Sequence, residues 1–125
     1  MASTILVIDD DPSIVHLLKE NLEQEGYRVL EGYDGQAALQ IAKKNKPNLI
    51  ILDVNMPLIN GLKALEFLRG LPETKNIPIL FLSGESSSVV APTLNAATRV
   101  AHVKKPIDLD DLNSLVRQLI EKYPI

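Results

Sequence analysis

Residues 5–12 of the sequence read ILVIDDDP, so four aliphatic residues run directly into three aspartates and a proline. An apolar run this short is typical of a strand that is buried on both faces. Asp11-Pro12 indicates a helix start, because aspartate is a favoured N-cap and proline fits the first helical position. Two carboxylates about 4 Å apart repel by roughly 4 kcal/mol at an effective dielectric near 20. We therefore expect Asp11 to turn away as a cap, while Asp9 and Asp10 point into a site that offsets their repulsion.

The same order, a short strand-like run and then a helical pattern, repeats along the chain. Strands are predicted at 4–8, 27–31, 49–52, 77–82 and 100–103. Apolar residues at helical spacing predict helices that begin at Pro12, at Asp34-Gly35, at Gly61, within 86–98 and after Asp108. Five such units over residues 1–125 predict one α/β domain. Its fold is a flavodoxin-like, doubly wound (βα)5 with a five-stranded parallel sheet in the order 2-1-3-4-5.

The fourth helical segment is the weakest of the five. Its sequence contains three serines and two valines, which are poor residues for a helix interior. Pro92 is accommodated at the first position of a helix and not in its middle. We therefore expect this helix to begin near Pro92, which leaves 84–91 as a long and mobile loop.

Composition excludes several classes of protein. The chain of 125 residues is 46% hydrophobic, which is too much for a disordered segment, and it has no cysteine for disulfides or thiolate metal sites. No apolar run approaches the roughly 18 residues of a membrane span, and no signal peptide is present. The net charge is −3 with both signs scattered, so no basic stripe indicates direct nucleic-acid binding. We expect a cytoplasmic protein that does not insert into membranes.

Polar residues gather where the predicted strands end. The first strand ends on Asp9 and Asp10, the third on Asp53, the fourth on Ser83 and the fifth near Lys105. Any one of them alone is often only a cap or turn residue, but in the predicted sheet all of them meet at one depression. Clustered carboxylates with no thiol or nearby imidazole suit a hard divalent ion, with Mg²⁺ as the first choice. The lysine and the hydroxyl suit a phosphoryl group.

The chain resembles the receiver domains of two-component response regulators, and in particular the free-standing chemotaxis regulators. The matching stretches are LVIDDDP (6–12), LIILDVNMPLINGL (49–62), ILFLSG (79–84) and VKKP (103–106). The resemblance implies that Asp53 accepts a phosphoryl group from a sensor histidine kinase or a histidine phosphotransfer protein. It also implies that Mg²⁺ or Mn²⁺ is bound by Asp9, Asp10 and Asp53 and by the backbone carbonyl of Asn55.

The resemblance assigns further roles and shows departures. Lys105, whose bond to Pro106 is expected to be cis, would pair with the phosphoryl group, and Ser83 would donate a hydrogen bond to that group. Asn55 and Glu85 would influence how fast the phosphoryl group is lost. His102 stands where receivers usually have the tyrosine or phenylalanine that reports the switch. The output partner is expected to meet the surface of helix 4, strand 5 and helix 5, but the sequence does not specify that partner.

Two alternatives remain open at this level. In a haloacid-dehalogenase-type phosphatase Asp9 would be the nucleophile and Asp11 the general acid. A receiver-like binding module that is never phosphorylated is the other alternative, although such a module is expected to have lost Asp53 or Lys105. On the receiver interpretation the domain is a phosphoacceptor with at most self-directed phosphotransfer and autodephosphorylation, and not an enzyme acting on other substrates.

Overall fold

The computed structural model of the chain describes residues 2–84 and 99–125. The prediction of a helix that begins near Pro92, the loop over 84–91 apart from Gly84, and the role given to Glu85 all fall outside the described residues. Within the described residues the strands are β1 (Thr4–Ile8), β2 (Arg28–Gly32), β3 (Leu49–Asp53), β4 (Ile79–Ser83) and β5 (Val100–Lys104). The helices are α1 (Pro12–Gln24), α2 (Gly35–Asn45), α3 (Gly61–Arg69) and α5 (Leu109–Lys122).

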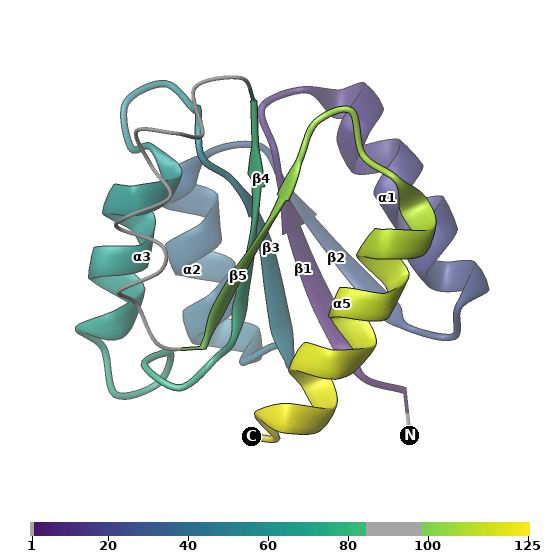
Figure 1. The fold of residues 1–125 in the computed structure, drawn as a ribbon. Helices are drawn as coiled ribbons and strands as arrows, with labels where there is room; N and C mark the ends of the chain where they lie inside the picture. Colours follow the sequence, from purple (N-terminus) through teal and green to yellow (C-terminus); the bar gives the residue numbers. More distant parts are fainter. Residues whose placement is uncertain (1, 85–98) are drawn as a thin grey trace.

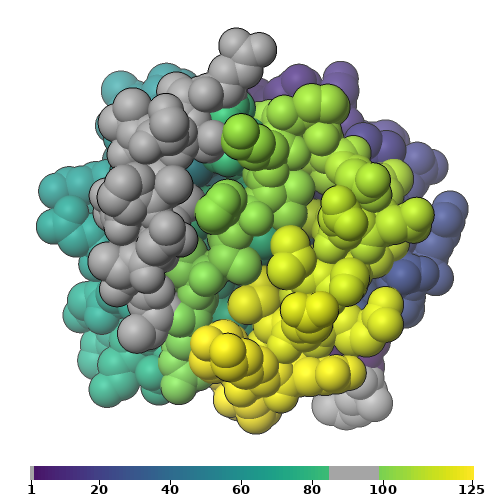
Figure 2. Space-filling view, viewed as in Figure 1, coloured from purple at the N-terminus to yellow at the C-terminus, as the bar shows by residue number. Residues whose placement is uncertain are grey.

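The five strands form one parallel sheet in the order β2-β1-β3-β4-β5, as predicted (Figure 1). Helices α2 and α3 cover one face of the sheet, and α1 and α5 cover the other. Figure 2 shows the face on which α5 and β5 lie side by side. The doubly wound, flavodoxin-like architecture predicted from the sequence is confirmed.

Alternation along the strands divides the core into two layers. In β1, for example, Leu6 and Ile8 pack with the layer beneath α2 and α3, while Ile5 and Val7 pack with the layer beneath α1 and α5. Every residue of β3 and β4 is buried. This is why both strands read as continuous apolar runs and not as alternating patterns.

Polar caps fix where the helices begin. The Asp11 side chain accepts a hydrogen bond from the Ser13 N–H at 2.9 Å, so the predicted N-cap of α1 is confirmed. Asp34 caps α2 in the same way, as the Asp34-Gly35 pair predicted. Asn60 caps α3 through the N–H of Lys63 at 2.9 Å.

The strand boundaries differ by a residue or two from those predicted. The fourth strand was predicted from residue 77 and begins at Ile79. Ile77 donates its N–H to Thr74 O in a turn at 3.2 Å, and Pro78, which has no N–H to donate, follows it. The same strand continues through Ser83, and the second strand covers 28–32 where 27–31 was predicted.

Strand register sets the geometry of the carboxyl edge of the sheet. Ile8 is paired with Leu52, so Asp9, which follows β1, lies beside Asp53, the last residue of β3. Ser83 is paired with Lys104, which places Lys105 directly beyond the end of β4.

Candidate functional site at the carboxyl edge of the sheet

Four of the predicted site residues meet at this edge. Asp9, Asp53 and Ser83 are 0%, 2% and 1% exposed, so their polar side chains lie almost entirely out of solvent. The Lys105 side chain is 27% exposed and reaches over them. Asp10 is exposed at the rim. The convergence of side chains expected from the strand ends is therefore present.

Lys105 contacts two carboxylates at once. Its Nζ lies 3.1 Å from Asp9 Oδ2 and 3.5 Å from Asp53 Oδ1. Its backbone N–H donates to Ser83 O at 2.7 Å, and the Lys105–Pro106 bond is cis, as predicted. The sequence predicted the approach to Asp53, whereas the shorter contact, with Asp9, was not anticipated.

Backbone amides hold the two buried carboxylates in place. The Asp11 N–H donates to Asp9 Oδ1 at 2.9 Å, and the Asn55 N–H donates to Asp53 Oδ1 at 3.2 Å. Asp9 Oδ2 has the ion-pair contact with Lys105, but that contact is not directed as a hydrogen bond. Apart from that ammonium, no donor among the described residues contacts this buried oxygen, so it keeps capacity for a further ligand.

Burial and like charge raise the pKa values of the carboxyls. Desolvation, followed by the neighbouring Asp9 charge, raises the pKa of Asp53 to about 6 against the opposing effect of Lys105. Burial likewise raises the pKa of Asp9. Burial lowers the pKa of the Lys105 ammonium, but the contacts with Asp9 and Asp53 outweigh that effect and leave the pKa raised. The lysine therefore stays charged, while the carboxyls resist ionisation.

The carboxylates fit a divalent cation. Asp9, Asp10 and Asp53 each offer an oxygen, and these oxygens lie within 4.8 Å of one another. An all-oxygen set that includes a buried oxygen with capacity for a further ligand matches hard ions such as Mg²⁺. The third aspartate of the run, Asp11, is excluded from this set because its side chain caps α1.

Gly61 is a feature of the site whose role the sequence did not reveal. A Cβ at this position would lie 2.4 Å from Asp53 O and 2.9 Å from Val54 Cα. Only glycine lets the start of α3 approach the backbone of Asp53 this closely. From the sequence, Gly61 was predicted only as the start of a helix. That prediction did not indicate that the helix start lies against the backbone of Asp53.

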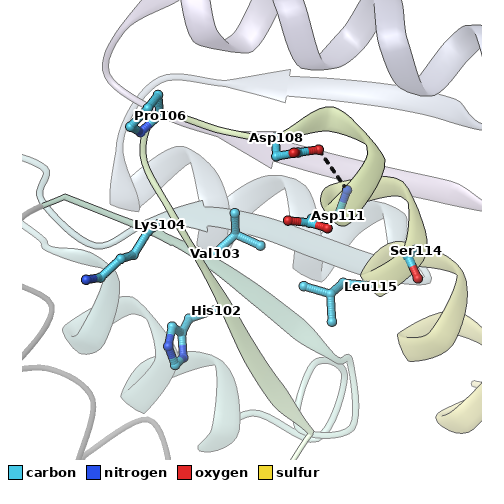
Figure 3. Close-up of a pocket in the computed structure, with 8 residues that line it drawn as sticks. All are labelled: His102, Val103, Lys104, Pro106, Asp108, Asp111, Ser114 and Leu115. Carbon is cyan, nitrogen blue, oxygen red and sulfur yellow. Dashed lines mark hydrogen bonds between the residues drawn. The ribbon is translucent and has the colours of Figure 1, made fainter.

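Ser83 and His102 lie on neighbouring strands, and their surroundings differ. The Ser83 hydroxyl is buried and donates a long hydrogen bond to Val103 O at 3.5 Å. His102 is exposed on β5 and lines a surface cavity of about 630 Å³ between β5 and α5 (Figure 3). On the opposite wall of that cavity Asp108 accepts a hydrogen bond from the Asp111 N–H at 3.2 Å.

Comparisons with known proteins agree with this geometry. Residues 5–117 match the family described as the response regulator receiver domain. The chain belongs to this family. The receiver domain is 36% identical over 128 residues to the alkaline phosphatase synthesis transcriptional regulatory protein PhoP of Bacillus subtilis, covering 100% of this chain and 51% of that protein. It is 32% identical over 124 residues to sporulation initiation phosphotransferase F of the same organism, covering 98% of this chain and 94% of that protein.

A solved structure extends the likeness to the fold. Chemotaxis protein CheY4 of Vibrio cholerae superposes with a TM-score of 0.88 at 29% identity, covering 95% of this chain and 99% of that one. The receiver domain thus spans about half the length of the transcriptional regulators that it matches, and nearly all of the phosphotransferase and the chemotaxis protein. It is a module of phosphorylation-based two-component signalling. Within 2–84 and 99–125, no helix is long and apolar enough to cross a membrane.

Proposed function

We propose that Asp53 is the phosphoacceptor and that the phosphohistidine of a sensor kinase or a histidine phosphotransfer protein is its donor. The observation that carries the proposal is the position of the Asp53 carboxylate. It is buried at the end of the central strand, with the Lys105 ammonium 3.5 Å away and Asp9 beside it. A buried carboxylate with an ammonium at this distance is placed to receive a group that brings negative oxygens with it.

The chemical step is a displacement at phosphorus. An Asp53 carboxylate oxygen forms the new P–O bond while the P–N bond to the donor imidazole breaks, and the imidazole leaves with the bonding electron pair. With a pKa of about 6, Asp53 is mostly ionised at pH 7 and so available as the nucleophile. Lys105 stabilises the charge on the transferring oxygens.

The acidic cluster supports a metal requirement. Asp9, Asp10 and Asp53, with the backbone carbonyl of Asn55, would hold Mg²⁺ or Mn²⁺. When bound, the ion supplies positive charge that offsets the carboxylates and the phosphoryl oxygens.

Ser83 and β5 would transmit the effect of phosphorylation from Asp53 to the protein surface. The Ser83 hydroxyl has only a 3.5 Å bond to Val103 O, which it can exchange for a stronger one to a phosphoryl oxygen. The charge at Asp53 would change from −1 to about −2, and this change biases the surface around β5 and α5. His102 lies on that surface, where an output partner would bind.

The alternatives predict different products. The cap role of Asp11 does not support its use as the general acid of a phosphatase.

One experiment distinguishes the proposed function from its alternatives. The purified protein would be incubated with acetyl phosphate and Mg²⁺, and the phosphoryl group located by mass spectrometry. Label on Asp53, absent from Asp53→Asn, supports the receiver mechanism. Label on Asp9 would support a phosphatase, and no label on the folded protein would support a bare binding module. Release of phosphate from unrelated phosphoesters would contradict the proposal that the domain acts only on its own aspartyl phosphate.

A further inference from the structure

The loop between β3 and α3 presents a leucine whose position the fold does not explain. Leu58 is 104% exposed, and the next most exposed large apolar side chain among the described residues, Ile125, is 54% exposed. The backbone of Leu58 also has φ +65°, in the left-handed region. For a bulky residue this conformation is an outlier, whereas glycine and asparagine adopt it readily.

The loop around Leu58 is held firmly at both ends. The Gly61 N–H donates to Val54 O at 2.9 Å and closes the loop. Next to Leu58, Ile59 packs against the start of α2, where a Cβ on Gly35 would lie 2.6 Å from Ile59 O. Leu58 is therefore presented to solvent by an ordered backbone.

The stability of the isolated domain does not account for this leucine. A fully exposed side chain removes no apolar surface from water, and the left-handed backbone opposes a bulky residue. Asparagine would relieve the strain and lose no contact. Strained backbone of this kind concentrates at functional sites.

The position of the loop indicates what meets Leu58. The loop follows Asp53 directly, at the carboxyl edge of the sheet that lies uppermost in Figure 1. The Asp53 side chain is 3% exposed, so a donor group has to come in close contact with the carboxyl edge of the sheet to react. A protein that carries the donor group must then lie against the surrounding loops, and the loop that exposes Leu58 is one of them.

Resting on the proposed function, we propose that Leu58 is a docking contact for the phosphohistidine-bearing donor protein, where it fills an apolar recess beside the phosphohistidine. An apolar side chain on an ordered loop suits such a contact, because little conformational entropy remains to be lost on binding. Loss of the contact should lower kcat/KM for the protein donor about tenfold, which corresponds to about 1.4 kcal/mol. A small donor needs no docking surface and should be unaffected.

The test compares a protein donor with acetyl phosphate. The wild type is first incubated with each autophosphorylated histidine kinase and each phosphorylated histidine phosphotransfer protein of the source organism. The protein that transfers its phosphoryl group fastest is then used as the donor. Rates are then measured for wild type, Leu58→Asn, Leu58→Met and the control Phe67→Asn, which removes another exposed apolar side chain further along α3. Urea denaturation should show that Leu58→Asn is at least as stable as wild type.

The expected result is a loss of about tenfold for Leu58→Asn with the protein donor and less than twofold with acetyl phosphate. Leu58→Met should retain most of the transfer rate, because it keeps an apolar side chain on the same strained backbone, and Phe67→Asn should match wild type. Unchanged transfer to Leu58→Asn would overturn the proposal, even if self-association or output binding changed. An equal loss of rate with the protein donor and with acetyl phosphate would also overturn the proposal. The same holds if acetyl phosphate labels the wild type and no protein donor does. Failure of acetyl phosphate to label wild-type Asp53 would instead refute the proposed function.

Discussion

We expect Asp53→Asn to be more stable than wild type at neutral pH without divalent cations and, on the proposed function, to accept no phosphoryl group. Asparagine keeps the size of the side chain and removes a charge that burial and Asp9 both oppose. Lys105 retains its 3.1 Å contact with Asp9 in the variant, so the substitution leaves the ammonium with a partner.

The size of the effect follows from the pKa of Asp53. The pKa rises from 3.8 in the unfolded chain to about 6 in the folded protein. At about 1.4 kcal/mol for each tenfold change in acidity, the ionised carboxylate destabilises the folded state by about 3 kcal/mol. As the pH rises above 3.8 the unfolded state loses its proton first, so wild-type stability falls until about pH 6 and the deficit is constant above it.

Urea unfolding in EDTA between pH 4 and 8 measures this difference. The gap between Asp53→Asn and wild type should be about 3 kcal/mol at pH 7.5 and should shrink to about 0.5 kcal/mol near pH 4. Asp110→Asn, which removes an exposed carboxylate from the first turn of α5, controls for the loss of one negative charge. A gap that does not depend on pH, or a variant less stable than wild type at pH 7.5, would refute the electrostatic account.

Two further predictions concern the same site, and a third concerns the surface of β5. Asp10→Asn should raise metal-free stability by about 1 kcal/mol and lose the stabilisation by Mg²⁺, as urea melts with and without the ion would record. Gly61→Ala should lower the rate of phosphorylation by acetyl phosphate and lower stability, because its Cβ would clash with Asp53 O at 2.4 Å; an unchanged rate and urea midpoint would contradict this. His102→Tyr should change output-partner affinity, because it replaces an exposed imidazole on the β5 surface; unchanged affinity would leave His102 as an exposed strand residue without a signalling role.

Local patterns were enough to predict the architecture and most of the site. Apolar runs that end on Asp9, Asp53 and Ser83 predicted both the strands and the meeting of their ends, since parallel strands share one carboxyl edge. The cap at Asp11 was also predictable, because capping depends on hydrogen bonds to residues two or three positions away.

Features that depend on distant parts of the chain were not predictable in the same way. The 3.1 Å contact of Lys105 with Asp9 depends on where the end of β5 sits across two intervening strands. The left-handed backbone at Leu58 depends on how the loop is anchored at α2, and a leucine gives no local signal for it. The start of β4 was misplaced because Ile77 is apolar and buried, yet its N–H is used in a turn.

The shared lysine connects the chemistry of the site with the shape of its surroundings. Three carboxylates and one ammonium leave the cluster with an excess charge of about −2, which a divalent cation matches. Lys105 divides its contacts between Asp9 and Asp53, and a phosphoryl group on Asp53 would draw the ammonium toward its oxygens. The backbone of Lys105 is bound to Ser83 O at 2.7 Å, so a shift of the lysine pulls on the ends of β4 and β5 together. On the proposed function, the residue that stabilises the unphosphorylated cluster would also transmit phosphorylation to the β5 surface.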